Sequence, residues 1–166
     1  EWAREPVLAS PPDGRKRIHL VAADMCETAA IQVEMVVYPP GSTAPDRTLS
    51  LATIGVTGSV GALSFVPPGF ANAGQLKVAS YSSNQWYGLA LTPDGAGTYD
   101  AAIANGPATV QGGPEGILYV PPGSALFPNY QYLLLTEYGA GAITAWQVDA
   151  QGNPVPASRL PFLTGL

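Results

Sequence analysis

Charged residues are scarce in this chain and make up 11% of its 166 residues, against about 25% in ordinary soluble domains. Only seven residues are Lys or Arg, and the net charge at pH 7 is −5. This balance argues against a nucleic-acid partner, because phosphate binding needs clustered cations. The one basic cluster, Arg15-Lys16-Arg17, stands where a turn enters a strand, and we interpret it as solvated.

Cysteine and histidine each occur once, as Cys26 and His19. A lone cysteine provides neither a disulfide framework nor a cluster of zinc ligands. The acidic neighbours of Cys26 disfavour a reactive thiolate. His19 has no accompanying GxSxG motif that would indicate a serine hydrolase. The sequence therefore offers no nucleophile with an adjacent base.

Long apolar runs are also missing, so we predict no transmembrane helix. The sequence starts at Glu1 without an apolar signal core, which is typical of a processed mature chain or of a numbered fragment. Lysine is rare, whereas Ala, Gly, Pro, Thr and Ser are abundant. This composition favours a secreted or periplasmic bacterial protein.

Glycine and proline are plentiful, with 19 and 17 residues, and the apolar fraction is 46%. Apolar residues recur with period two and never with a sustained period of 3.6, so we predict an all-β fold. The predicted strands are residues 7–9, 17–23, 31–37, 47–54, 62–66, 75–81, 85–91, 98–104, 116–120, 130–137, 142–148 and 158–163. Turns are expected between them, including Pro93-Asp94-Gly95 and Asn105-Gly106-Pro107.

The strands are arranged in an internal repeat. Val66-Pro67-Pro68-Gly69 matches Val120-Pro121-Pro122-Gly123. The separation in sequence between these two matched motifs is the first and shorter of two offsets that relate the copies. The later copy is slightly longer after this turn, so Tyr81 matches Tyr138 at a longer offset. A fainter copy opens the chain. We therefore predict one domain, residues 1–166, with three repeats at about 5–56, 57–111 and 112–166.

Four antiparallel strands in a repeat of about 55 residues are typical of a β-propeller blade. The segments YVPPGSALF and YLLLTEYGAGAITAWQVDAQGNPV resemble the NHL-like repeats of extracellular bacterial β-propellers. The resemblance covers nearly the whole chain and implies three four-stranded blades. It implies little about function, because this fold serves enzymes, sensors and binding scaffolds alike.

Three blades would leave two sheet faces uncovered, because closed propellers usually have four to eight blades. Two chains could close a six-bladed ring as a homo-oligomer, or the chain could belong to the remainder of a larger propeller. Stacking without closure would instead produce a filament. These alternatives stay open at the level of sequence.

A metal site is one candidate for chemistry. Glu115, in Pro114-Glu115-Gly116, resembles the metal-binding glutamate of the calcium-dependent lactonase propellers. Asp24 and Glu137 end the second strands of their repeats and could face the same end of the axis. Converging oxygen ligands are what Ca²⁺ requires. Solvated turn acids are the competing interpretation.

Aromatic residues are the other candidate, since Trp86, Tyr87, Tyr138 and Trp146 gather around the second and third strands of their repeats. They could stack on a sugar or a peptide, or they could fill the wedges between blades. With no cofactor other than a possible Ca²⁺, we predict a non-enzymatic scaffold or binding module. The alternatives are a lactonase-like hydrolase or lyase and a structural subunit of an extracellular assembly.

Overall fold

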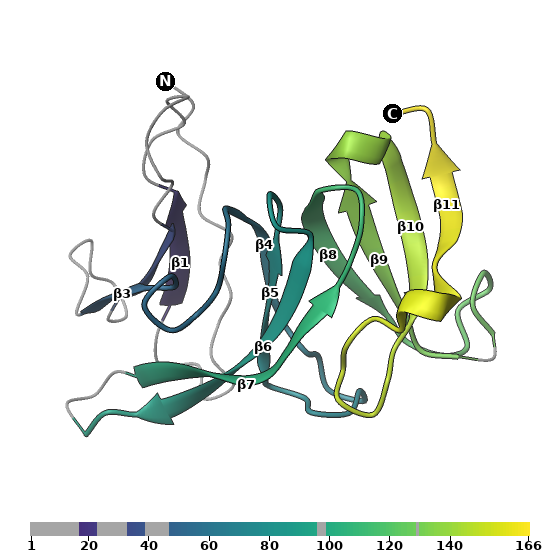
Figure 1. The fold of residues 1–166 in the computed structure, drawn as a ribbon. Coiled ribbons are helices and arrows are strands. Elements are labelled where there is room, and N and C mark those ends of the chain that lie inside the picture. Colours follow the sequence, from purple (N-terminus) through teal and green to yellow (C-terminus); the bar gives the residue numbers. More distant parts are fainter. Residues whose placement is uncertain (1–16, 23–32, 39–46, 96–98, 129) are drawn as a thin grey trace.

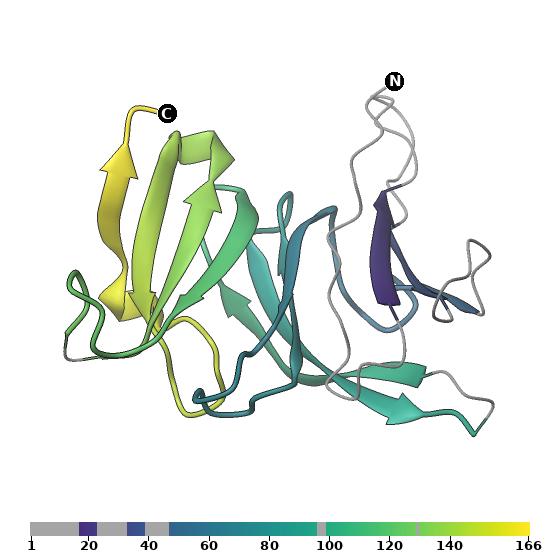
Figure 2. The ribbon, with the colours of Figure 1, turned by 180° about the vertical axis from the view of Figure 1, so that it is seen from behind.

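The computed structural model describes residues 17–22, 33–38, 47–95, 99–128 and 130–166, which form three antiparallel sheets (Figures 1 and 2). The first sheet contains β1 (Arg17–Ala22), β2 (Val33–Tyr38) and β3 (Arg47–Ser50). The middle sheet contains β4 (Val60–Phe65), β5 (Leu76–Ser80), β6 (Gln85–Pro93) and β7 (Tyr99–Thr109). The last sheet contains β8 (Pro114–Val120), β9 (Tyr132–Glu137), β10 (Ala142–Gln147) and β11 (Leu160–Thr164).

The all-β prediction is confirmed, and the middle and last sheets each have four antiparallel strands that neighbour one another in chain order. Two single 3₁₀ turns, η1 (Tyr138–Ala140) and η2 (Pro156–Ser158), are the helical elements described. The described part of the first sheet has three strands, and the predicted strand at residues 7–9 lies outside the described residues. The described residues form no closed ring or barrel, so the propeller stays a hypothesis. None of the helical segments described is long and apolar enough to cross a membrane.

The middle and last sheets share one pairing register. Leu76 pairs with Leu89 in the middle sheet, and their matches at the longer offset, Leu133 and Trp146, pair with each other in the last. Each first hairpin also contains a register shift, between Val60 and Ala62 and, at the shorter offset, between Pro114 and Gly116. Residues that the two sequence offsets match by type therefore also occupy matching positions in the strand pairing of the two sheets.

The two four-stranded sheets pack face to face. Their shared core is a cluster of buried residues contributed by both sheets and the segments beside them: Ala62, Val66, Phe70, Ala79, Trp86, Val110, Tyr119, Leu133, Leu135 and Trp146. Strands β4 and β8 approach most closely, since a Cβ placed on Gly61 would meet the carbonyl oxygen of Pro114. The opposite face of the middle sheet packs on the segment before it, which contributes buried Leu51 and Val56.

The predicted strand at residues 47–54 is wrong in its second half, because β3 ends at Ser50 and a turn follows. The amide of Thr53 donates to the carbonyl oxygen of Ser50 at 3.2 Å, and the amide of Val56 donates to that of Leu51 at 3.0 Å. These local hydrogen bonds occupy backbone amide and carbonyl groups that a longer strand would have needed for pairing with its neighbour. The apolar side chain of Leu51 instead enters the core beside the middle sheet.

Asn105-Gly106-Pro107 is not a turn, because all three residues lie within β7. The register between β6 and β7 shifts on either side of Gly88, so the glycine and proline mark an irregularity inside a long strand. Gly106 has a φ of +100°, which a residue with a side chain rarely adopts. The turn residues thus bend the strand without ending it.

Candidate functional site at the end of the last sheet

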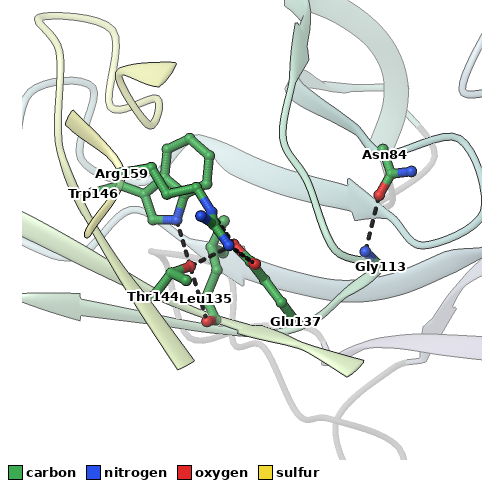
Figure 3. Close-up of polar contacts among 7 residues, drawn as sticks. All are labelled: Asn84, Gly113, Leu135, Glu137, Thr144, Trp146 and Arg159. Atoms are coloured by element: carbon green, nitrogen blue, oxygen red, sulfur yellow. Dashed lines mark hydrogen bonds and ion pairs between the residues drawn. The ribbon is translucent and has the colours of Figure 1, made fainter. Parts of the chain in front are cut away.

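Glu137 is the last residue of β9, and its side chain is fully buried. It shares the inward face of β9 with Leu133 and Leu135, as the period of two in a strand requires. Its carboxylate binds the guanidinium of Arg159, which lies between η2 and β11. The Arg159 Nη2 to Glu137 Oε2 distance is 2.5 Å, and Arg159 Nε donates to Oε1 at 3.0 Å (Figure 3).

Thr144 and Trp146 on β10 extend this contact into a chain of hydrogen bonds (Figure 3). The Thr144 hydroxyl donates to Glu137 Oε1 at 2.6 Å, and the Thr144 oxygen accepts a bond from Trp146 Nε1 at 2.7 Å. The hydrogen bond to Glu137 raises the pKa of Arg159 above its usual value. The buried carboxylate is therefore a fully partnered anion that joins β9, β10 and the start of β11.

The linker Gly112-Gly113 lies against the same carboxylate. A Cβ on Gly112 would lie 2.6 Å from Glu137 Oε2. Gly113 donates its amide to Asn84 Oδ1 at 2.9 Å (Figure 3). The carbonyl oxygen of Gly113 accepts the Tyr138 amide at 3.1 Å. This junction ties the β5–β6 turn of the middle sheet to the end of β9.

A surface pocket of about 550 Å³ opens beside this junction. Its lining residues are Glu115, Thr136, Glu137, Tyr138, Gly139, Gly141, Ala142 and Leu166. The structure thus brings together residues from two separate predictions: Glu115 and Glu137 as metal ligands and Tyr138 as an aromatic platform. Tyr138 is 70% exposed.

The predicted calcium ligands are only partly brought together. Glu115 and Glu137 line the pocket, but both oxygens of Glu137 are already bound by Arg159. Asp24, the third predicted ligand, lies outside the described residues. Among the residues described, no three His, Cys, Asp or Glu side chains gather as a metal site would need. Among the side chains that line the pocket, Glu115 is therefore the one carboxylate without an arginine partner.

Three of the four aromatic candidates lie in the core. Trp86 and Trp146 fill the space between the middle and last sheets, and Tyr87 packs on the opposite face of the middle sheet. Their polar atoms have internal partners, since Trp86 Nε1 donates to Asn153 Oδ1 at 3.1 Å and Tyr87 contacts the Thr57 hydroxyl at 2.8 Å. Of the four, only Tyr138 presents its ring to solvent.

A second polar cluster, centred on Lys77, was not identified from the sequence. Lys77 lies in the middle of β5 and is fully buried between the two sheets. Its ammonium group donates to Gln75 Oε1 at 2.5 Å, to Asn153 Oδ1 at 2.7 Å and to the Gln151 carbonyl oxygen at 2.8 Å. The one available signal was a lysine inside an apolar strand, at the position where the next repeat has Leu134.

Burial lowers the pKa of Lys77 to about 8, and the nearby Asp149 carboxylate opposes part of this shift. Asp149 also shapes the turn that holds the acceptors, because Oδ1 accepts the amides of Gln151 and Asn153, both at 2.8 Å. At the same turn the Tyr119 hydroxyl donates to the Gly152 carbonyl oxygen at 2.8 Å, and burial raises its pKa. The cluster thus fastens a turn of the last sheet to the face of the middle sheet.

Comparison of the chain with protein-family models, with curated proteins and with solved structures found no match. The resemblance to NHL-like repeats therefore rests on the sequence motifs, and the function has to be inferred from the geometry of the described residues.

Proposed function

We propose that the chain is a non-enzymatic scaffold or binding module of a secreted or periplasmic protein, built from propeller-type blades. The shared register of the middle and last sheets supports a repeated building unit. Their face-to-face packing supports stacking as the way in which such units join. The composition, poor in charge and rich in small residues, supports a location outside the cytoplasm.

The proposal rests mainly on the hydrogen bonds of two buried ionisable side chains, Lys77 and Glu137. Lys77 donates two hydrogen bonds, to Gln151 and Asn153, that join a turn of the last sheet to the middle sheet. Both carboxylate oxygens of Glu137 accept hydrogen bonds from Arg159, and Oε1 also accepts one from the hydroxyl of Thr144. The ammonium group of Lys77 and the carboxylate of Glu137 thus hold strands and sheets together through hydrogen bonds, which is the role expected of buried ionisable groups in a scaffold.

A lactonase-like, calcium-dependent hydrolase or lyase is the second candidate, and one observation favours it. Glu115 and Glu137 line the same pocket, as that hypothesis requires. Calcium needs six to eight oxygen ligands, so Glu137 would have to exchange Arg159 for the ion. The exchange would break the hydrogen-bonded pair that holds the start of β11 to β9.

A calcium titration separates the two candidates. We expect no heat of binding in calorimetry and no change in the midpoint of thermal unfolding when millimolar Ca²⁺ is added to the chain. The Glu115→Gln variant serves as the matched control, because it removes the charge and keeps the shape. A rise in the unfolding midpoint with Ca²⁺ that disappears in Glu115→Gln would refute the scaffold proposal in favour of the metal site.

A further inference from the structure

The amine of Lys77 and the side-chain amide of Asn153 lie against each other between the middle and last sheets. Lys77 has no exposed surface, and its Nζ lies 2.7 Å from Asn153 Oδ1. A carbonyl bond is about 1.2 Å long, so Nζ lies within about 4 Å of Asn153 Cγ. That carbon is electrophilic, and an uncharged amine is a nucleophile. Two groups that can form an amide bond with each other are therefore held close to the geometry of attack.

Burial makes the amine of Lys77 reactive. Lys77 stands on β5 between Leu76 and Val78, which are also buried. Burial lowers the pKa of Lys77 to about 8. About one tenth of the amine is then uncharged at pH 7 and about half at pH 8, whereas an ordinary lysine is almost wholly charged at both. A desolvated lysine of this kind is an activated nucleophile.

Trp86 and Asp149 contact the two ends of the Asn153 amide. Trp86 Nε1 donates to Asn153 Oδ1 at 3.1 Å. An N–H donor at this oxygen stabilises the negative charge that develops there when a nucleophile adds to Cγ. Asp149 Oδ2 lies 3.4 Å from Asn153 Nδ2, the nitrogen that would leave. The Asp149 carboxylate also acts on the charge of Lys77, so it is placed to take a proton from the amine and to give one to Nδ2.

Two other side-chain amides lie near the amine of Lys77. Its Nζ donates to Gln75 Oε1 at 2.5 Å and to Asn105 Oδ1 at 3.4 Å. In the part of the chain that the structure describes, only the Asn153 amide combines an indole donor at its oxygen with a carboxylate at its nitrogen. The geometry therefore favours Asn153 over the other two amides.

We propose that Lys77 and Asn153 react with each other to form an intramolecular isopeptide bond, which joins the middle sheet to the last sheet. The uncharged Nζ adds to Cγ, and the electron pair of the carbonyl moves onto Oδ1. The pair returns as the bond between Cγ and Nδ2 breaks. Nζ loses one proton and Nδ2 gains one through Asp149, so ammonia leaves and no oxidant, reductant or other reactant is needed.

The product is an uncharged amide in place of a buried ammonium group, so the reaction removes the cost of burying that charge. The bond also links residues far apart in the sequence, which restricts the unfolded chain. A free amine at Lys77, with its titration, exists only before the bond forms. Stability measurements on this amine therefore need chains whose mass shows that they are unreacted.

Mass spectrometry of the intact, denatured chain tests the proposal. The folded parent chain is expected to be lighter than its sequence mass of 17.1 kDa by one ammonia molecule. Protease digestion should release a branched peptide in which Lys77 is joined to Asn153. Lys77→Met and Asn153→Ala should both keep the full sequence mass. A parent chain that keeps its full mass would overturn the proposal, and so would a branch at Gln75 or Asn105 or an ammonia loss that persists in Lys77→Met.

Asp149→Asn is the variant that tests the reaction without removing either reacting group. Its Oδ1 can still accept the amides of Gln151 and Asn153 that shape the turn, so circular dichroism should show an unchanged fold. We expect the ammonia loss to be at least about 100-fold slower, because the proton carrier is gone. Gln151→Ala is the matched control, since Lys77 contacts only the backbone of Gln151, and it should react as the parent does. Reaction of Asp149→Asn at the parent rate would overturn the role of Asp149. Calcium binding does not change the covalent mass of the chain, so this test is independent of the proposed function.

Discussion

The carboxylate of Glu137 is fully buried at the end of β9, and the guanidinium of Arg159 binds both of its oxygens from the entrance to β11. The pair closes one end of the last sheet. The Arg159 side chain is 29% exposed, so the guanidinium contacts solvent whereas the carboxylate of Glu137 does not. Removing only one partner of this ion pair should therefore change the free energy of unfolding by a different amount from removing both.

Arg159→Met should destabilise the fold by about 3 kcal/mol, because it leaves a buried carboxylate without its cation. Glu137→Leu combined with Arg159→Met should cost less than Arg159→Met alone, since no uncompensated charge then remains. Urea unfolding of the parent, the two single variants and the double variant provides the double-mutant cycle. Additive costs would show that the pair has no coupling.

The stability of the chain should rise by about 2 kcal/mol between pH 7 and pH 10 through Lys77. The pKa of Lys77 is about 8 in the folded chain and 10.5 when unperturbed, so between these values the unfolded chain binds more protons. The cost of burying the ammonium group is present below pH 8 and is relieved above it. Above pH 10 the trend should reverse, because the raised pKa of Tyr119 keeps its hydroxyl protonated in the folded chain only.

Lys77→Met is the control for this pH dependence. The thioether cannot titrate, so the rise between pH 8 and pH 10 should disappear from urea unfolding curves measured at each pH. An equally steep rise in Lys77→Met would assign the effect to other groups.

Asn153→Ala should cost about 2 kcal/mol, because Asn153 Oδ1 accepts bonds from both Lys77 Nζ and Trp86 Nε1. In a Lys77→Met background the same substitution should cost clearly less, since one of the two donors is gone. Thermal and urea unfolding of the four proteins would measure this coupling. Equal costs in both backgrounds would place Lys77 outside the cluster that Asn153 organises.

Gly112→Ala should destabilise the chain more than Gly123→Ala. Both glycines have positive φ values, +76° and +86°, so both substitutions strain the backbone. Only the Gly112 methyl group would lie 2.6 Å from the Glu137 carboxylate, whereas a methyl at Gly123 would meet nothing within 4 Å. We expect a difference of about 2 kcal/mol in unfolding free energy, and equal losses would show that the linker can move away from the carboxylate.

The predicted strands of the middle and last sheets were recovered because their signals are local. Period-two alternation and the Pro-Pro-Gly turns act on neighbouring residues. The structure adds that residues matched by the repeat occupy matching pairing positions in the two sheets. Boundaries were missed where a local hydrogen bond competed with pairing, as after Ser50. They were also missed where a strand absorbed turn residues as a bulge, as at Gly106.

The candidate site was predictable only in its residue types. The sequence assigned Glu115 and Glu137 to one metal site and Tyr138 to a separate aromatic site, whereas all three residues line one pocket. Trp86 and Trp146 were ambiguous because an aromatic side chain suits a core and a binding platform equally well, and burial decides between the two.

The sequence by itself determined the strand class and most strand positions, because these follow from the order of apolar and turn residues along the chain. Only the tertiary structure decided that Glu137 binds Arg159 and that Lys77 is buried. These outcomes depend on which sheet faces meet, and that depends on contacts between residues far apart in the sequence, which no local pattern records.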